Sequence, residues 1–342
     1  MKNFLKNILP LIILLILSIQ CSQKKNMTKQ LNDLFNKKKV TILVTDSGLG
    51  GLSVAADLAA RLPQGGVFEK AQIVFFNSLF HSGSGYNYLK SEAEKVRIFN
   101  IALETMGKKY HPDLLLIACN TLSVIYDQTL FSKKENFPVI GIVETGADLI
   151  AKQFYNNPDS RSIIFATQTT IDANSHKNML TNRGYAEEKI IGQPCSMLAD
   201  YIEEGANSEM TTLVISEYVS QALEKIDTSE THLFASLNCT HYGYSIQQFK
   251  NAFSEAGYPE IKIINPNPEM GNFLFKPQYL NRFPKTEVTI EVVSKTKITE
   301  AKIASLGKLV QMISPQTAEA LINYLYDPDL FDAKFDSSDI GL

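Results

Sequence analysis

The chain has 342 residues, of which 44% are hydrophobic and 20% are charged, which is the composition of a globular protein with a sizeable core. Its length allows one large domain or two smaller ones. The formal net charge is −3 and no face rich in Lys and Arg stands out, so a nucleic-acid partner is not expected.

An apolar segment preceded by lysines begins the chain. Lys2 and Lys6 precede an apolar run over residues 8–19, and Cys21 follows this run. Positive charge followed by a short apolar stretch is typical of a secretory signal, and the stretch is shorter than the roughly 20 residues of a membrane span. The cysteine after it resembles the lipobox of bacterial lipoproteins. We therefore predict a signal peptide over residues 1–20 and lipid attachment to Cys21.

The fit to a lipoprotein signal has two departures. Gln20 stands where a small residue is usual, and Leu17 is one place away from its usual position. The alternatives are a plain N-terminal anchor helix with an incidental cysteine, or translation from Met27, which would give a cytoplasmic protein. With the signal, the protein is lipid-anchored in the cell envelope, and residues 21–38 form a polar tether.

Short runs of apolar and β-branched residues recur from about residue 40 onward. Continuous apolar runs suit strands that are buried on both faces of a parallel sheet. Helical patterns lie between the runs, and this alternation indicates α/β architecture. The predicted strands cover residues 40–45, 71–76, 113–119, 137–142, 161–167, 189–192, 232–237 and 261–265.

The clearest helix is predicted over residues 91–106. Ser91 and Glu94 form a candidate capping box at its start, and Gly107 is expected to end it. One apolar face is expected from the helical spacing of Val96, Phe99, Leu103 and Met106.

Two cysteines stand where predicted strands end. Cys119 lies in "LLLIACNT" and Cys239 in "LFASLNCTHY", 120 residues further on. Ligands bind at the carboxyl ends of strands in open α/β sheets. We therefore predict two similar parallel-sheet α/β halves that face each other across a central cleft, each contributing one cysteine.

This α/β region is expected over residues 39–270, with the boundaries between its halves near residues 135–150 and 245–260. Residues 271–342 are interpreted as a C-terminal extension. It contains "KTEVTIEVVSKTKIT" from residue 285, whose alternation is typical of an exposed strand. No recognisable chemistry marks this segment.

A glycine-rich turn follows the first predicted strand. In "TDSGLGGLSV", Asp46 and Ser47 stand at the strand end, and the glycines allow a tight turn close to a ligand. Ser53 replaces the third glycine of a dinucleotide-binding loop, so that interpretation is weak. The alternative is that Asp46 or Ser47 caps the following helix.

Together, "DSGLGG", "ACNT" and "NCTHY", in this order, resemble the motifs of the glutamate racemases of the aspartate/glutamate racemase superfamily. The resemblance covers roughly residues 40–270. Each motif alone is weak, but three in order at predicted strand ends are specific. The resemblance implies a cofactor-independent racemase of glutamate or a related amino acid, in which two cysteines act as bases.

The chemistry of racemisation fits these residues. A proton α to a carboxylate is very weakly acidic, and inversion needs a base on one face of the substrate and an acid on the other. A free thiol has a pKa around 8.5, so neighbours must help to ionise it. By resemblance, Cys119 and Cys239 are the bases, Asp46 assists Cys119, and His241 assists Cys239. Glu203 would be a further acidic helper; its alternative is a solvated carboxylate at a helix end.

The resemblance also implies residues that hold the carboxylates and ammonium of the substrate. These are Ser47, Asn120, Thr121 and Thr240. The stretch "ATQTTIDANSH" matches a threonine motif of the family and adds Thr167 and Thr170, of which Thr170 is preferred.

One loop departs from the family pattern. In "FFNSLFHSGSGYNYLKSE", Asn77 and Ser78 replace an Asp-Thr pair, and Asn87 and Tyr88 fall where Tyr-Gly is expected. Because that loop contacts substrate in the family, we predict substrate contacts from Asn87 and Tyr88. The loss of a carboxylate at Asn77 suggests an amino acid other than glutamate, and the alternative is that glutamate remains the best substrate.

The remaining cysteines and histidines are given structural roles. Without Cys21 the cysteine count is odd and widely spaced, so neither a disulfide framework nor a metal site is expected. Cys195 is expected to be a small buried residue. His232 is interpreted as packed, and His111 and His176 as structural or surface residues. The role of His81 is left open.

Three functions compete. The first is an amino-acid racemase, the second another isomerase of the superfamily, and the third an envelope-anchored amino-acid-binding protein without turnover. The expected partners are a small amino-acid substrate, a membrane reached through the lipidated N-terminus, and a second copy of the chain in a homodimer.

Overall fold

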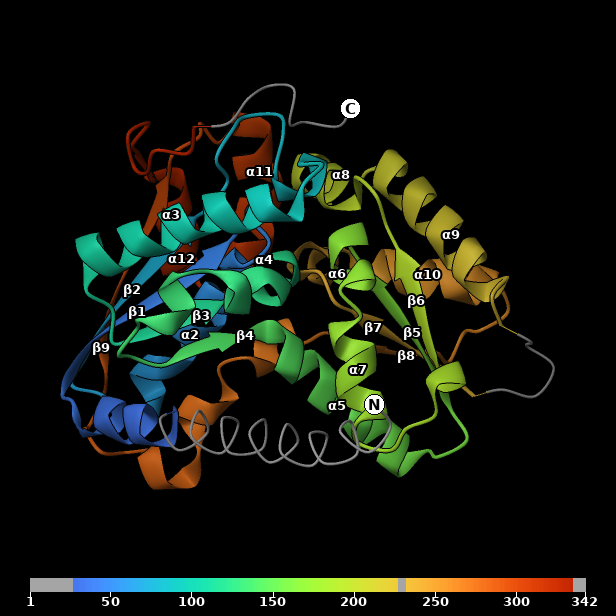
Figure 1. The fold of residues 1–342 in the computed structure, drawn as a ribbon, viewed down its shortest axis with the longest axis horizontal. Coiled ribbons are helices and arrows are strands. Elements are labelled where there is room, and N and C mark those ends of the chain that lie inside the picture. The colour runs from blue at the N-terminus through green and yellow to red at the C-terminus, as the bar shows by residue number, and fades with distance from the viewer. Residues whose placement is uncertain (1–26, 227–231, 335–342) are drawn as a thin grey trace, which may run out of the picture.

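The structure is a computed structural model that describes residues 27–226 and 232–334. Two sheets organise the chain, and Figure 1 shows them side by side with helices on both faces of each. The predicted signal peptide and Cys21 lie outside the described residues. Within the described part of the chain, no helix is both long and apolar enough to span a membrane.

The first domain is built on a six-stranded sheet in the order β10-β9-β2-β1-β3-β4, in which all neighbours are parallel. Its strands are β1 (Lys39–Asp46), β2 (Lys70–Asn77), β3 (Leu114–Ile117), β4 (Val139–Gly141), β9 (Glu287–Ser294) and β10 (Leu325–Tyr326). Its helices are α2 (Leu52–Gly65), α3 (Glu92–Tyr110), α4 (Asn120–Ile125), α11 (Glu300–Ile313) and α12 (Pro315–Ile322), with a 3-10 helix η1 (Tyr86–Tyr88).

The second domain has a four-stranded parallel sheet in the order β6-β5-β7-β8. Its strands are β5 (Arg161–Ala166), β6 (Ile190–Pro194), β7 (Leu233–Leu237) and β8 (Lys262–Ile264). Its helices are α6 (Gln168–Asp172), α7 (Ser175–Thr181), α8 (Leu198–Gly205), α9 (Glu209–Leu223) and α10 (Ile246–Glu255), with the 3-10 helix η5 (Thr240–Ser245). Helix α5 (Ile142–Asn156) leads into this domain from β4.

The two halves share one strand order. In each sheet the second strand of the half is followed by its first, third and fourth, as in β2-β1-β3-β4 and β6-β5-β7-β8. Strands β3 and β7, which precede the two cysteines, therefore hold the same place in their sheets. The prediction of two similar parallel-sheet α/β halves is confirmed, and all eight predicted strands are present.

The apolar runs form strands because both faces of each sheet are covered. Along β1, Ile42 and Val44 pack into the core under α2, whereas Leu43 packs into the core under α3. In the second domain, helices α8, α9 and α10 cover one face of the sheet and α5 and α7 the other. Side chains on both faces of each strand thus meet apolar partners. This explains why the strand sequences do not alternate between apolar and polar residues.

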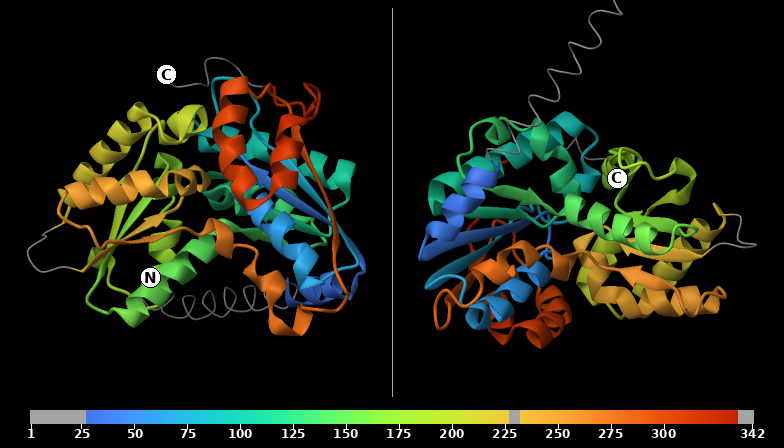
Figure 2. Two further views of the ribbon diagram at one scale, coloured as in Figure 1. Left: turned by 180° about the vertical axis from the view of Figure 1, so that it is seen from behind. Right: turned by 90° about the horizontal axis from the view of Figure 1, so that it is seen from below.

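The C-terminal part of the chain is not a separate extension, which corrects the boundary expected at residue 270. Strand β9 pairs with β2 along its whole length and extends the first sheet. In its first half, exposed residues alternate with Val288 and Ile290, which pack against the core, and Val292 and Val293 in its second half are buried. Figure 2 shows helices α11 and α12, in red, packed beside α2 on the first domain.

Two smaller expectations also differ from the structure. Helix α3 continues past Gly107 and ends at Tyr110, where His111 takes the left-handed conformation with φ 44°. The Ser91 side chain caps its start, as predicted, by accepting from the Glu94 N–H. The chain crosses between domains along residues 142–156, which overlap the first predicted boundary and extend beyond it, and it returns only after β8, slightly beyond the second.

Removing the C-terminal strand and helices should abolish cooperative folding. A chain that ends after residue 284 loses β9, α11 and α12, which bury Val292, Val293, Leu306, Val310 and Leu321. Each such side chain stabilises by roughly 1.5–3 kcal/mol, so the loss is comparable with a whole free energy of unfolding of about 5–15 kcal/mol. Thermal unfolding followed by circular dichroism tests this, with a chain ending after residue 334 as control. Equal midpoints for the two chains would contradict the prediction.

Candidate active site

Cys119 and Cys239 line one cavity between the domains. Cys119 follows β3 and is 5% exposed, and Cys239 follows β7 and is 6% exposed. This inner cavity is also lined by Asp46, Ser47, Asn87, Asn120, Thr121, Thr167, Ala199 and His241. The structure therefore brings together two free thiols from opposite domains, which the strand-end positions alone had indicated.

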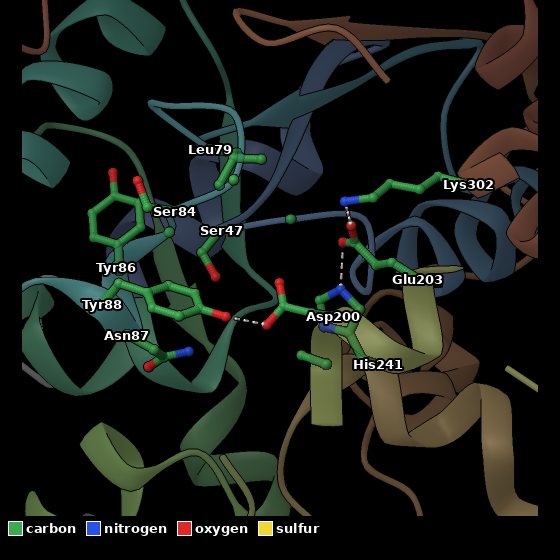
Figure 3. Close-up of a pocket in the computed structure, with 14 residues that line it drawn as sticks. Ser47, Leu79, Ser84, Tyr86, Asn87, Tyr88, Asp200, Glu203, His241 and Lys302 are labelled. Carbon is green, nitrogen blue, oxygen red and sulfur yellow. Dashed lines mark hydrogen bonds and ion pairs between the residues drawn. The ribbon is translucent and has the colours of Figure 1, made fainter. Parts of the chain in front are cut away.

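An outer cavity adjoins the inner one and shares some of its lining. Ser47, Asn87, Ala199 and His241 belong to both. Residues of η1, the loop before it and α8 form much of the rest of the wall, and Figure 3 shows them around the opening. Tyr88 of η1 donates to Asp200 Oδ2 of α8 at 3.0 Å, so a hydrogen bond crosses between the domains at this cavity.

A chain of polar contacts leads away from Cys239. The His241 Nδ1 lies 3.7 Å from Cys239 Sγ, and His241 Nε2 lies 2.7 Å from Glu203 Oε1. The second oxygen of Glu203, Oε2, accepts from Lys302 Nζ at 2.8 Å (Figure 3). Cys239, His241, Glu203 and Lys302 thus form a continuous series, here called the Cys239 relay.

The charges in the Cys239 relay support one another. Burial raises the pKa of Glu203, but hydrogen bonds and charges from His241 and Lys302 outweigh this and lower it to about 2. Burial lowers the pKa of His241, whereas its bonds to Cys239 and Glu203 and their charges raise it to well above its ordinary value. His241 is therefore an imidazolium at neutral pH, and an imidazolium beside Cys239 stabilises its thiolate.

Cys119 has a different environment. Its Sγ lies 3.1 Å from the Ser47 hydroxyl oxygen, and no cation is among the causes that shift its pKa. Burial and the negative charge of Asp46 raise the pKa of Cys119 well above its ordinary value, and the hydrogen bonds from Ser47 only partly oppose them. Cys119 is therefore held as a thiol. The two thiols therefore have unlike neighbours, an imidazolium beside Cys239 and a carboxylate near Cys119.

Asp46 acts on Cys119 through its charge and through Ser47. Its Oδ1 accepts from the Ser47 backbone N–H at 2.6 Å, and its Oδ2 accepts from the Thr240 hydroxyl at 2.6 Å. The second bond joins the two domains. The N-cap residue of α2 is Gly51, and no side chain caps this helix. The interpretation that Asp46 or Ser47 caps α2 is therefore wrong.

The glycines of "DSGLGG" are required by close approach of the second domain. A Cβ on Gly50 would overlap the Thr240 hydroxyl oxygen and lie 2.7 Å from the backbone nitrogen of His241. A Cβ on Gly48 would lie 2.6 Å from Glu203 Oε1. The glycines thus admit a neighbouring domain rather than a dinucleotide, which agrees with the missing third glycine of that motif.

The predicted substrate-binding residues fall into two groups. Ser47, Asn87, Asn120, Thr121 and Thr167 line the inner cavity. Both polar side-chain atoms of Asn120 are buried without a hydrogen-bond partner among the described residues. A buried amide without partners is costly, so Asn120 is available to a polar ligand.

Thr170, Thr240 and Tyr88 are not part of the lining of the inner cavity. The Thr170 hydroxyl bonds to the Thr167 hydroxyl at 3.0 Å and lies outside both cavity linings, so the preference for Thr170 over Thr167 is reversed. Thr240 is engaged by Asp46, and Tyr88 lines only the outer cavity. Their roles toward a substrate stay predictions.

The substitution at Asn77 does not alter the cavities directly. Its side chain is 1% exposed, donates to Ser294 Oγ of β9 and accepts from the Leu79 N–H. Ser78 is equally buried and bonds to Thr45. Neither lines the inner or outer cavity. The argument that a missing carboxylate changes the substrate therefore loses its basis.

Three contributors were missed by sequence reasoning. Lys302 and Asp200 line the outer cavity, and Asn267 donates to the Thr240 carbonyl oxygen at 2.8 Å. None stands in a motif. Glu203, in contrast, is 5% exposed, so its alternative as a solvated carboxylate is wrong.

The remaining histidines and Cys195 lie outside both cavity linings. His81 is exposed and its Nδ1 lies 2.9 Å from Ser84 Oγ. His232 is exposed rather than packed, and His176 is buried, which lowers its pKa to about 4. Cys195 is buried, as expected. No group of three or more His, Cys, Asp or Glu side chains in the described residues is placed to hold a metal ion.

Comparison with known proteins identifies the class of fold. Glutamate racemase from Francisella tularensis, solved in complex with D-glutamate, superposes with a TM-score of 0.61 at 22% identity, covering 84% of this chain and 96% of that one. The chain therefore has the two-domain α/β fold of that racemase.

Sequence relatives indicate which kind of enzyme has this fold here. The chain is 27% identical over 243 residues to glutamate racemase from Persephonella marina, covering 69% of this chain and 82% of the relative. It is 28% identical over 201 residues to glutamate racemase from Neisseria meningitidis, covering 58% and 67%. No protein-family model matches the chain. The relatives support the glutamate racemase family and indicate an isomerase that racemises an amino acid.

Filling the space at Gly50 should weaken the contact between the domains. In a Gly50→Ala variant the new methyl group would meet Thr240 and the His241 backbone, and such overpacking costs about 1–3 kcal/mol. We expect a lower midpoint of thermal unfolding. The control is Gly307→Ala, where the methyl group would lie 4.0 Å from Leu321 in a helix interior, so stability should hold or rise. Equal midpoints for Gly50→Ala and the wild type would refute the close approach.

Proposed function

We propose that the chain is a glutamate racemase in which Cys119 and Cys239 act as the two bases. The observation that carries this proposal is the shared inner cavity, which both thiols line from opposite domains. The thiols also have unlike neighbours, because His241 approaches Cys239 whereas Asp46 and Ser47 approach Cys119. Racemisation needs this combination of a base and an acid around one carbon atom.

The proposed reaction starts with Cys239 as thiolate and Cys119 as thiol. The Cys239 thiolate takes the α-proton from one face of the substrate, so that the C–H bond breaks and its electron pair stays on carbon. The Cys119 thiol then gives its proton to the opposite face and becomes a thiolate. Cys239 is now the thiol, so the enzyme is set for the reverse direction until protons exchange with solvent.

Groups of the inner cavity would hold the substrate during this exchange. The carbanion-like state places charge on the α-carboxylate, and donors already in position stabilise such charge without reorganisation. Asn120 and the hydroxyls of Ser47, Thr121 and Thr167 are among the donors of this cavity. The Thr121 and Thr167 hydroxyls lie 2.9 Å apart and come from different domains, so a ligand bonded to both would also fasten the domains.

Glutamate is the proposed substrate for two reasons. The sequence relatives are glutamate racemases, and one structure with the same fold contains D-glutamate. In addition, Asn77, where the missing carboxylate argued for another amino acid, is bonded away from both cavities, although Asn87 and Tyr88 of the same loop line them. Other superfamily reactions and a binding protein without turnover are outcomes that the experiment below would reveal.

Attachment to a membrane through Cys21 is proposed as well. Its support is the sequence alone, in which Lys2, Lys6 and a short apolar run precede the cysteine. A homodimer also stays a prediction. Exposed apolar side chains on the segment from α11 to β10, such as Met312, Ile322 and Leu325, would be covered in such a contact.

Replacing either proposed base should reduce racemisation without any added cofactor. In Cys119→Ser and Cys239→Ser the hydroxyl is a far weaker acid, and a lost general acid or base costs about 10²- to 10⁴-fold. Polarimetry on L- and D-glutamate, aspartate and neutral amino acids measures the effect. Cys195→Ala is the control, because this buried thiol lies outside both cavity linings.

Several results would reject the proposed function. Full activity of either serine variant excludes the two-base mechanism, and dependence on added pyridoxal phosphate does so too. A higher specificity constant for another amino acid excludes glutamate as the preferred substrate. Binding of an amino acid in calorimetry without turnover would identify a binding protein.

Lipid attachment should depend on Cys21. We expect cells supplied with a labelled fatty acid to transfer the label to the wild-type chain, which should sediment with membranes. Cys21→Ala removes the sulfur that would carry the lipid, so its label should be lost. Unlabelled wild-type protein that begins at Met27 would show that translation starts there instead.

A further inference from the structure

Lys302 reaches the site from the C-terminal segment, in which no recognisable chemical motif was found in the sequence. It stands near the start of α11, in the part of the chain that completes the first domain. Its ammonium lies 2.8 Å from Glu203 Oε2 and its side chain is 21% exposed, against 7% for Glu203. Figure 3 shows Glu203 held between Lys302 on one side and His241 on the other.

The two oxygens of Glu203 have separate partners. Oε1 accepts from the Leu49 backbone N–H at 2.7 Å and lies 2.7 Å from His241 Nε2. Oε2 is bonded to Lys302. A buried carboxylate oxygen without a partner is costly, so removal of Lys302 would leave Glu203 free to turn or to take a proton, and either change weakens its hold on His241.

The position of α11 does not depend on this ion pair. Leu306 and Val310 are buried in the core of the first domain, and the Ser305 hydroxyl accepts from the Ala206 N–H of the second domain at 3.3 Å. Leu309 packs against the cores of both domains. The helix therefore stays in place when the charge of Lys302 is removed, and the effect of the charge can be measured by itself.

The charges of the Cys239 relay sum to zero only when Lys302 is included. A thiolate at Cys239, the His241 imidazolium, the Glu203 carboxylate and the Lys302 ammonium balance one another. Asp200 and Glu204 add negative charge near Lys302, and the Glu204 carboxylate lies 3.8 Å from its ammonium. Without Lys302 the buried group would carry a net negative charge, which disfavours the thiolate.

We propose that Lys302 is a positioning residue that fixes Glu203 and thereby keeps His241 charged and directed at Cys239. The inference deepens the proposed function and rests on it. Lys302 supports the relay from behind Glu203. Direct contact with the substrate is a different role, because a residue that only binds substrate raises KM and leaves kcat unchanged. A surface ion pair would change neither, since exposed pairs contribute little.

The test compares Lys302→Met with Lys308→Met in the full-length chain. Lys308 lies on the same helix, is exposed and is the matched control. For Lys302→Met we expect kcat for glutamate to fall about tenfold or more, with the rise of activity moved toward higher pH. A displacement of one pH unit changes the thiolate fraction tenfold at a given pH. Lys302→Arg keeps the charge and should recover much of the activity.

A second measurement does not require turnover. In a background in which Cys21, Cys119 and Cys195 are alanine, the rate of alkylation of Cys239 by iodoacetamide against pH reports its thiolate. We expect Lys302→Met to move this profile to higher pH and Lys308→Met to leave it unchanged. If Lys302→Met shows no cooperative unfolding transition, Lys302→Gln, which keeps a donor to Glu203 without the charge, is measured in its place.

The outcomes separate the two proposals. Wild-type protein without racemase activity rejects the proposed function, while the alkylation profile still decides the role of Lys302. Active wild-type protein with identical kcat and identical alkylation profiles for the Lys302 and Lys308 variants rejects the positioning role. A rise in KM alone would assign Lys302 to substrate contact and would also reject the positioning role.

Discussion

The site depends on the contact between the turn that follows β1 and the turn that follows β7. Asp46 accepts a hydrogen bond from Thr240, and the Leu49 N–H donates to Glu203. Each domain therefore supplies a carboxylate that accepts a hydrogen bond from the other domain. Gly50 makes this approach possible because a side chain there would overlap Thr240. The contact sets how far Cys119 and Cys239 stand apart, since both thiols follow strands that are rigidly held in their own sheets.

Equivalent positions in the two sheets carry thiols with opposite surroundings. The carboxylate of Asp46 near Cys119 disfavours a second negative charge, whereas the imidazolium of His241 near Cys239 favours one. Similar strand order therefore does not give similar chemistry. The difference comes from the residues after each strand, because the turn after β7 carries His241 and α8 supplies Glu203. In the proposed reaction, this difference distinguishes the base from the acid.

The sequence predicted the fold and the pair of thiols well because both depend on local patterns. Apolar runs identify buried strands, and small polar residues after Cys119 and Cys239 mark strand ends. Contacts between distant segments gave no such signal. The place of β9 beside β2 and the ion pair of Lys302 with Glu203 join residues far apart in the chain. The face of the sheet on which the Asn77 side chain lies could not be predicted either, because a one-residue change of register turns a side chain to the other face.

The late position of β9 couples the completion of the first domain to the site in the second. The first sheet can close only after the chain has left it, formed the second domain and returned, and such distant pairing carries an entropic cost that local contacts must outweigh. The returning chain then places α11 against α8, next to Glu203. Until this segment docks, Glu203 lacks its contact with Lys302. The arrangement thus ties the charge state of the Cys239 relay to completion of the fold.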